Sequence, residues 1–421
     1  MTKPGEAGGW LRILGPGIAV AATGVGAGDL LAAMLAGAKL GTTLLWVIVV
    51  GAALKLALNE GVARWQLATG TTVLEGWGEH LGRAFQLGFL LYLVVWSFVV
   101  AGGLMSACGV AAHALVPAVS IGVWAAAHGL IALALVWWGS YQRFETAMKS
   151  LVGLMVLTLV TSAVLVGPDL VGVLRGLLVP TLPRGSATTV LSLMGGVGGS
   201  VTILSYGYWI REKGWTGGSW LGVVRRDLGI GYVLTGVFGA AMLVLAAVAL
   251  SGAGAMPPGS QGLVTCGDAL RDAATLRFGT GVGDSAKWIF LVGLWAAVFT
   301  STLGVWQGVP YLFADFSRGL RRSTSTAEVD ERSWTYRGYL LYLALPPMTL
   351  LVLGRPVWVI KLYTLTGGLF MPVLAASLLW LTTRRSVMGD LRTRPLGLIA
   401  LVAALALFVA VGVRQVLDGW G

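Results

Sequence analysis

The chain has 421 residues, of which 56% are hydrophobic and only 11% are charged. Charged residues make up about 25% of an ordinary soluble domain, so this composition excludes one. In a soluble chain the net charge of +11 would suggest nucleic acid as a partner. In a membrane protein, Lys and Arg residues gather in the cytoplasmic loops, and this explains the positive charge. We therefore expect the lipid bilayer, and not nucleic acid, as the partner.

Hydropathy predicts an all-α polytopic membrane protein with eleven transmembrane helices. Apolar runs of about 20 residues suffice to cross a hydrocarbon core near 30 Å thick. The expected spans cover residues 11–36, 43–67, 86–114, 121–138, 147–167, 188–210, 227–250, 285–315, 337–353, 357–382 and 395–416. The third and the eighth are long enough to tilt or to protrude. The first run is too long for a signal peptide and has no small-residue cleavage motif, so we expect it to act as both targeting signal and first span.

The basic residues of the loops set the expected orientation. Nineteen of the 29 Lys and Arg residues fall on the side of the N-terminus, nine fall on the other side, and Lys55 lies within the second span. Because cytoplasmic loops are enriched in Lys and Arg, we expect a cytoplasmic N-terminus and an external C-terminus in the plasma membrane. The charged segment 318–337 is then a cytoplasmic loop.

Glycines interrupt the first span. Gly24, Gly26 and Gly28 occupy alternate positions, with the carboxylate of Asp29 beside them. Glycine weakens a helix by roughly 1 kcal/mol relative to alanine, so this spacing favours local unwinding. Unwound backbone is tolerated in a membrane only where protein or a watery cavity satisfies its polar groups. We therefore interpret residues 22–29 as a broken helix that lines a binding site.

A second glycine cluster lies in the sixth span, over residues 194–202, and includes Gly196 and Gly199. Interrupted helices at matching positions of two halves indicate an inverted-repeat transporter with its site near the bilayer midplane. On this interpretation residues 1–170 form the first five-helix repeat, 171–390 the second, and 391–421 an additional span. The alternative is that these small residues only allow close helix packing.

Several motifs resemble the Nramp family of divalent-metal transporters. They are Gly15-Pro16-Gly17, then Ala36-Gly37-Ala38-Lys39-Leu40-Gly41 with Leu44-Leu45-Trp46, then Ala63-Arg64 with Thr69-Gly70. These segments are similar in order and spacing to the family's GPG, AGAxxGxxLLW and ARxxxxTG segments. The resemblance is specific over residues 13–75, and beyond them it depends on the span count and the sixth-span glycines. It implies a LeuT-like fold of two inverted five-helix repeats with broken helices 1 and 6.

The same resemblance implies that the metal site of the family is missing. The family's Asp-Pro-Gly-Asn motif falls on residues 26–29, so Gly26 replaces the metal-binding aspartate and Asp29 replaces the asparagine. Its Met-Pro-His-Asn motif falls, to within one residue, on 199–202, which lacks the soft thioether that favours transition metals. Asp29 is then the one candidate metal ligand.

Other family positions point the same way. Gly196 takes the position that offers a backbone carbonyl in the family, and Tyr206 falls near a family histidine. Residues 96–115 contain no Asp or Glu, where the family carries acids of a proton route, and 357–381 lacks the glutamine of the tenth span. The resemblance therefore implies a divergent relative with the Nramp scaffold.

Charged residues inside spans are costly and are candidates for function by default. Lys55 is expected to face a cavity or a partner carboxylate such as the one at the first break. Glu60 and Arg64 suit an i,i+4 ion pair with a structural role. Asp315 is expected to cap a helix or to pair with Arg318.

Enzymatic motifs are not apparent. His80, His113 and His128 show no HExxH pattern, and there is no GxxxxGK[ST] loop. Cys108 and Cys266 lack metal or redox spacing. We expect no enzyme, no cofactor and no disulfide.

Three functions remain open. The first is a secondary transporter of a small organic or zwitterionic solute. The second is transport of a divalent cation such as Mg²⁺ or Mn²⁺, with Asp29, backbone oxygens and water as ligands. The third is a non-transporting receptor or partner subunit. A monomer suffices for this scaffold, and the candidate substrate-binding residues are Gly24, Gly26, Gly28, Asp29, Gly196, Gly199, Thr202 and Tyr206.

Overall fold

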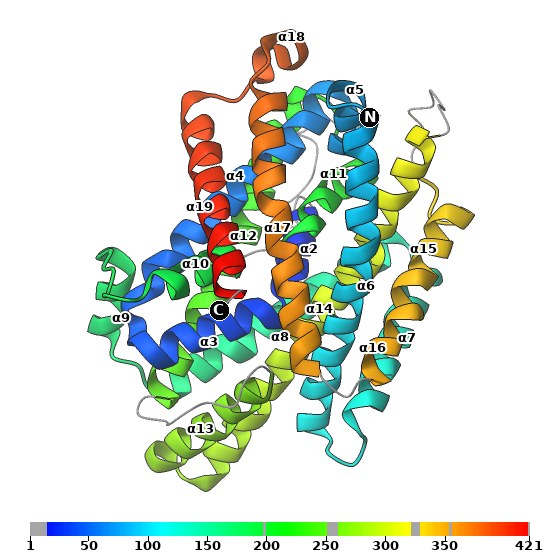
Figure 1. Ribbon diagram of the computed structural model, residues 1–421. Helices are drawn as coiled ribbons and strands as arrows, with labels where there is room; N and C mark the ends of the chain where they lie inside the picture. The colour runs from blue at the N-terminus through cyan, green and yellow to red at the C-terminus, as the bar shows by residue number, and fades with distance from the viewer. Residues whose placement is uncertain (1–14, 197–198, 251–259, 321–328, 353–355, 420–421) are drawn as a thin grey trace.

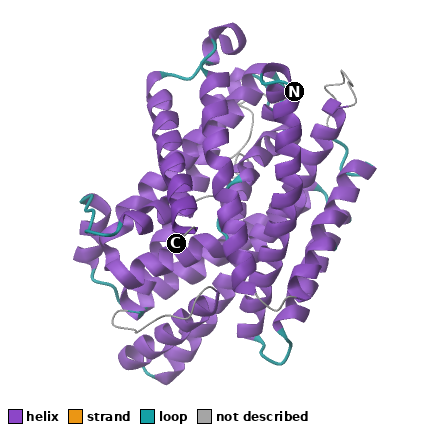
Figure 2. Cartoon of the chain, in the orientation of Figure 1, coloured by secondary structure: helices purple, strands orange, loops and turns teal. Residues whose placement is uncertain are grey.

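The computed structural model describes residues 15–419, apart from 197–198, 251–259, 321–328 and 353–355. All regular structure in this described part is helical (Figures 1 and 2). The first half contains α2 (Pro16–Gly24), α3 (Ala27–Leu40), η1 (Gly41–Leu44), α4 (Leu45–Thr69), α5 (Val73–His80), α6 (Arg83–Leu115), α7 (Ile121–Trp137), α8 (Tyr141–Leu165) and α9 (Leu170–Leu178).

The second half begins with another interrupted helix. It contains α10 (Ala187–Gly196), η2 (Val201–Leu204), α11 (Ser205–Glu212), η3 (Gly218–Trp220), α12 (Leu221–Ala249), α13 (Ser260–Phe278), α14 (Thr280–Leu320), α15 (Trp334–Ala344), η4 (Pro346–Met348), α16 (Thr349–Val352), α17 (Pro356–Thr382), α18 (Arg385–Met388), η5 (Gly389–Leu391) and α19 (Pro395–Gly419). Each of the eleven expected spans corresponds to a helix or an interrupted helix in this order.

Length and apolarity alone select fewer spans than hydropathy predicts. Six helical segments among the described residues are long and apolar enough to cross a bilayer, and a bent pair at 366–391 adds a seventh. The expected long third and eighth spans correspond to α6, with 33 residues, and α14, with 41. The total of eleven crossings stays a prediction.

Local capping explains where several helices begin. The Thr72 hydroxyl accepts from the Glu75 amide at 3.1 Å, while the Glu75 carboxylate accepts from the Thr72 amide at 2.6 Å, which is a capping box at the start of α5. Asp169 accepts from two amides of the first turn of α9. Ser333 caps α15 in the same way.

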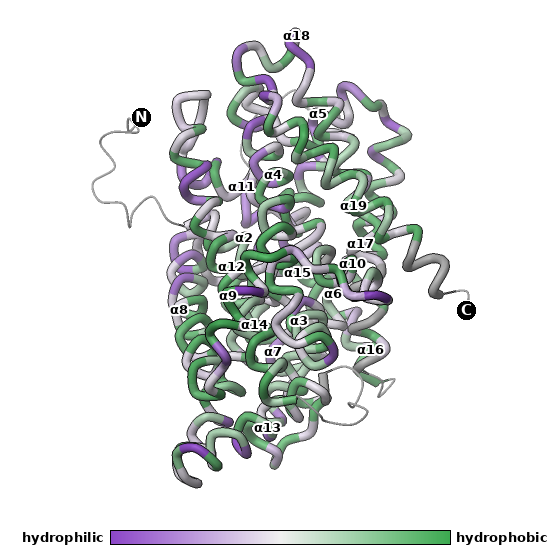
Figure 3. The backbone as a smooth tube through the Cα atoms, turned by 90° about the vertical axis from the view of Figure 1, so that its left-hand side faces the viewer, coloured by the Kyte–Doolittle hydropathy of each residue, from purple (hydrophilic) through white to green (hydrophobic). Residues whose placement is uncertain are grey.

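The half-helix α2 lies at the centre of the bundle (Figure 1), and all nine of its residues are buried. It packs against α8, α11, α12 and α14. Helices α5 and α18 lie at one end of the bundle, and α13 lies at the other. Coloured by hydropathy, the chain carries hydrophilic segments near α18 and α5 (Figure 3). The centre of the molecule is therefore built around a short helix with no exposed face.

Glycine allows α2 and α12 to cross in backbone contact. A Cβ atom placed on Gly231 of α12 would lie 2.2 Å from the carbonyl oxygen of Gly17, and one on Gly17 would lie 2.3 Å from the carbonyl oxygen of Asp227. No side chain fits into either space. The close approach fixes α12 against the first half of the broken helix.

Replacement of Gly231 by alanine is expected to lower the free energy of unfolding by about 1–3 kcal/mol, because the methyl group forces the two backbones apart. Gly229, on the same helix, has open space around its Cα position. Gly229→Ala is therefore the matched control, and it should be neutral or slightly stabilising. Thermal unfolding in detergent would compare the two variants, and equal melting temperatures would contradict the proposed close packing.

Candidate functional site

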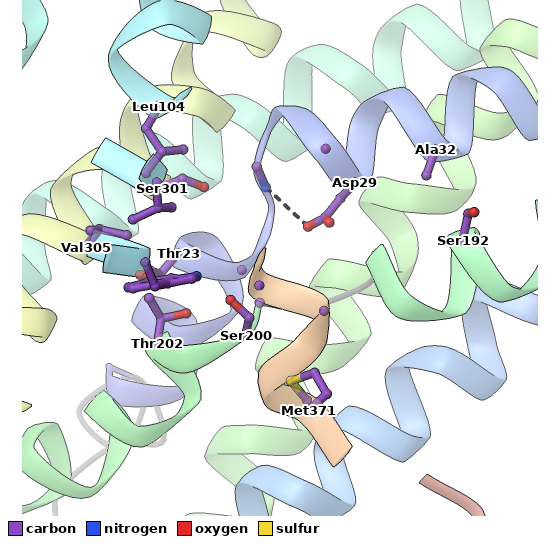
Figure 4. A pocket seen from close by; sticks show the side chains of 18 of the residues that line it. Thr23, Asp29, Ala32, Leu104, Ser192, Ser200, Thr202, Ser301, Val305 and Met371 are labelled. Carbon is purple, nitrogen blue, oxygen red and sulfur yellow. Dashed lines mark hydrogen bonds between the residues drawn. The ribbon is translucent and has the colours of Figure 1, made fainter. Parts of the chain in front are cut away.

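The first break lies between α2 and α3, at Val25 and Gly26. The hydroxyl of Ser301, on α14, is placed to donate to the carbonyls of Val25 at 2.8 Å and Ala22 at 3.3 Å, the latter also accepting from the amide of Val25. The carboxylate of Asp29 accepts from the amide of Gly26 at 3.3 Å (Figure 4). Polar groups that the interrupted helix leaves without helical partners are thus satisfied, as a buried break requires.

The second break separates α10 from η2. Gly199 has a φ of +81°, a backbone conformation that side-chain-bearing residues rarely adopt. A Cβ atom on Gly199 would lie 3.1 Å from the Cα atom of Gly24 and 3.0 Å from the hydroxyl oxygen of Thr202. The two breaks therefore touch each other, and the contact needs glycine at position 199.

A cavity of about 150 Å³ lies where the breaks meet (Figure 4). Its polar side chains are mostly hydroxyls. They are Thr23, Asp29, Ser192, Ser200, Thr202 and Ser301. Glycine backbone is exposed to it at Gly24, Gly26, Gly28, Gly199, Gly367 and Gly368. Among the lining residues of the described chain, Asp29 is the one carboxylate.

Helices outside the two breaks close the rest of the cavity. Trp96, Val100 and Leu104 come from α6, Val305 from α14, Met371 from α17, and Phe408 and Val411 from α19. The indole N–H of Trp96 is buried and has no hydrogen-bond acceptor among the described residues. A Cβ atom on Gly367, which also lines the cavity, would lie 3.6 Å from this nitrogen. The wall of the cavity thus includes a residue with a buried donor that has no acceptor in the described part of the chain.

Lys55 is buried next to this cavity, with only 1% of its surface exposed. It lies on α4, and its ammonium group donates to the backbone carbonyl of Gly199. The ammonium nitrogen lies 5.3 Å from the ring centroid of Phe408, and the carboxylate of Asp29 acts on it electrostatically. The side chain of Lys55 therefore links α4 to the second break and also interacts with Asp29, near the first break.

Metal donors are sparse in the described residues. No group of three or more His, Cys, Asp or Glu side chains is arranged to hold a metal ion there. One soft donor does line the cavity, the thioether of Met371, and it comes from the tenth expected span instead of the sixth (Figure 4). The donor set consists of one carboxylate, one thioether, hydroxyls and backbone carbonyls.

A polar cluster around Asp227 holds the beginning of α2. The buried carboxylate accepts from the amide of Gly15 at 3.2 Å and from the amide of Gly17 at 2.6 Å. The hydroxyl of Tyr206, on α11, donates to the same carboxylate at 3.0 Å. A negative charge at a helix N-terminus is stabilising, and here it also links α2, α11 and α12.

Other ion pairs gather at the α5 end of the bundle. Glu60 pairs with Arg64, as predicted, and also with Arg225 at 2.9 Å. Asp315 pairs with Arg318 at 2.8 Å, also as predicted, and accepts from the hydroxyl of Tyr208 at 2.6 Å. These contacts join α4 to α12 and α11 to α14 at this end of the molecule.

A sequence profile described as "Natural resistance-associated macrophage protein-like" matches residues 17–418. The chain belongs to the Nramp family. Its similarity extends to the "Divalent metal cation transporter MntH" of Acidiphilium cryptum (strain JF-5), which is 24% identical over 98% of this chain and 92% of the relative. Nramp proteins are membrane transporters, so the chain is an integral membrane protein of a transporter family.

Solved structures show the fold shared by this Nramp chain. The Eremococcus coleocola manganese transporter, in complex with an aromatic bis-isothiourea substituted compound, aligns with a TM-score of 0.76 at 18% identity, covering 98% of this chain and 89% of that one. MhsT in complex with L-phenylalanine aligns with a TM-score of 0.55 at 18% identity, covering 94% and 98%. The predicted LeuT-like architecture is confirmed.

Most of the predicted site residues of this Nramp chain line the central cavity. They are Gly24, Gly26, Gly28, Asp29, Gly199 and Thr202. Gly196 ends α10, but its surroundings lie outside what the structure describes. Tyr206 does not line the cavity, because its hydroxyl is bound to Asp227 in the cluster that holds α2.

Sequence reasoning missed the contributions of α6, α14 and α17 to the site. Trp96, Ser301 and Met371 lie in long apolar stretches, and a fully buried helix gives no periodicity that identifies its cavity-facing side. The unusual density of hydroxyls in the segment Thr300-Ser301-Thr302 was the one available signal.

Tyr206→Phe is expected to lower the free energy of unfolding by about 1–2 kcal/mol, because it removes a hydrogen bond to a buried carboxylate. Tyr141 is the matched control, since its buried hydroxyl has no partner among the described residues. Tyr141→Phe should leave stability unchanged or raise it. Thermal unfolding of both variants tests this, and a destabilised Tyr141→Phe with an unaffected Tyr206→Phe would contradict the assignment of the Asp227 cluster.

Proposed function

We propose that this Nramp-family protein transports a small polar organic solute and not a transition-metal ion. The observation that carries the proposal is Trp96, which lines the cavity and whose buried indole N–H has no acceptor among the described residues. Metal ions require electron-pair donors, and an N–H group is unsuited to bind them. It suits a carbonyl or carboxylate oxygen of a solute.

The charges around the cavity support the same proposal. Asp29 is the one lining carboxylate, and the ammonium of Lys55 acts on it across the second break. A divalent cation would meet both the attraction of Asp29 and the repulsion of Lys55. A zwitterionic or neutral solute adds no net charge and is compatible with this balance.

The size of the cavity suits a molecule larger than a single ion. Its volume of about 150 Å³ compares with roughly 10–15 Å³ for one water by the same kind of measure. The hydroxyls of Ser192, Ser200 and Thr202 can donate or accept hydrogen bonds to such a solute. MhsT, which shares this architecture, is a precedent for an organic ligand in the fold, since its structure contains L-phenylalanine.

We further infer that transport follows alternating access around the two breaks, in a monomer of the plasma membrane with a cytoplasmic N-terminus. The distribution of basic residues supports this orientation. It would place the ion pairs of Glu60 and Asp315 at the cytoplasmic end.

Divalent-cation transport is the second candidate function. Met371 and Asp29 both line the cavity, and a thioether with a carboxylate can bind a soft divalent ion. The relative from Acidiphilium cryptum is named a divalent metal cation transporter. This candidate requires the cation to outweigh the nearby ammonium of Lys55.

Uptake into proteoliposomes separates the two functions. The probes are a panel of radiolabelled neutral and zwitterionic amino acids and short-chain carboxylates, with Mn²⁺ and Mg²⁺ measured in parallel. We expect saturable uptake of at least one organic solute and none of either ion. Uptake of Mn²⁺ or Mg²⁺ that Asp29→Ala abolishes would establish the second function in place of the first.

Trp96→Phe is expected to weaken the apparent affinity for the organic solute found in that panel about five- to tenfold, because one hydrogen bond of about 1 kcal/mol is lost. Trp306→Phe is the matched control. Its indole N–H is also buried without a described partner, but Trp306 does not line the cavity. Equal apparent affinities for the two variants would remove Trp96 from the binding site.

A further inference from the structure

Lys55 occupies a place where a lysine is costly. It lies within α4, with only 1% of its surface exposed. Lysines near the ends of membrane helices usually extend toward the interface, and charged side chains that stay inside are rare. The ammonium group of Lys55 must therefore be stabilised by what surrounds it in the protein.

The surroundings of Lys55 are those of a cation site. Its ammonium donates to the carbonyl of Gly199, which the unwound sixth span leaves available outside a regular helix. The ring of Phe408 lies 5.3 Å away, within the range of a cation–π contact. Asp29, at the first break, supplies the negative charge. A backbone carbonyl, an aromatic face and a carboxylate are groups that hold monovalent cations.

Lys55 also differs from the structural polar residue one turn away on the same helix. Asn59 is buried too, but its amide donates to the hydroxyl of Tyr232 on the neighbouring α12, an ordinary contact between helices at 3.3 Å. Lys55 instead donates to a backbone carbonyl of the second break, that of Gly199. A general need for polar contacts between α4 and its neighbours does not explain this placement.

We propose that Lys55 is a built-in cation, which occupies the position of a free monovalent cation at the junction of the two breaks and balances the charge of Asp29. This inference concerns the same cavity as the proposed function. It implies that the protein needs no dissolved cation to neutralise Asp29. It also means that Lys55 excludes small cations from the cavity. Its ammonium group interacts with the protein groups that would bind such cations, and it repels them.

Removal of the ammonium should create a sodium site. In Lys55→Gln the charge of Asp29 and the carbonyl of Gly199 become available to Na⁺, which stabilises the protein in proportion to its binding. Thermal unfolding is measured in NaCl and in N-methyl-D-glucamine chloride of equal ionic strength. We expect the wild type to have the same melting temperature in both salts. The melting temperature of Lys55→Gln should rise with sodium, and half of that rise should occur at a sodium concentration at least about tenfold below any that affects the wild type. Lys55→Gln combined with Asp29→Asn should lose that response.

Two controls make the result specific. Lys39 lies on the exposed side of α3, so Lys39→Gln removes the same charge away from the cavity and should show no sodium response. Lys55→Arg keeps the charge and should also show none. Lys55→Met keeps the apolar stem and provides the second test if Lys55→Gln does not fold.

Three outcomes overturn the assignment. They are a folded Lys55→Gln or Lys55→Met that ignores sodium, a sodium response in the wild type equal to that of the variant, and a response retained without Asp29. Sodium binding is measured on purified protein, so it succeeds or fails independently of solute uptake. Uptake of Mn²⁺ by the wild type would contradict the proposed function while leaving the sodium measurement to decide the role of Lys55.

Discussion

The structure depends on a contact between two pieces of unwound backbone. A Cβ atom on Gly199 would lie 3.1 Å from the Cα atom of Gly24, and this close approach brings the breaks of the first and sixth spans together. The cavity lies at that contact, and residues of both breaks line it. Unwinding is costly inside a membrane, and it is tolerated here because Ser301 and Asp29 satisfy the first break while Lys55 satisfies a carbonyl of the second.

The ammonium of buried Lys55 and the carboxylate of half-buried Asp29 are the two charged groups at the cavity. Within a low-dielectric interior an isolated charge is strongly disfavoured, so Asp29 and Lys55 are best understood together. Both belong to helices that pack on α10, yet each reaches a different break. Around them, hydroxyls and glycine backbone offer hydrogen bonds without further charge. Apart from Asp29, the polar groups described around the cavity are therefore neutral.

Much of this architecture was predictable, because hydropathy indicates where membrane helices lie and closely spaced glycines indicate where such a helix is interrupted. The break at Val25 and Gly26, inside the predicted segment 22–29, follows from local sequence, as do the Glu60–Arg64 and Asp315–Arg318 pairs. The partner of Lys55 was not predictable, because the carbonyl of Gly199 becomes available only through unwinding and has no sequence signature. Helix α13 was also missed, since a polar nineteen-residue helix gives no hydropathy peak.

The half-helix α2 is held at both of its ends. Asp227 holds its N-terminus through the amides of Gly15 and Gly17, and Ser301 holds its C-terminus through carbonyls of the break. Its anchors come from two different helices, α12 and α14. A movement of α2 as a lever must therefore detach it from one of them first. The order in which these two sets of hydrogen bonds break would decide whether α2 stays with α12 or with α14.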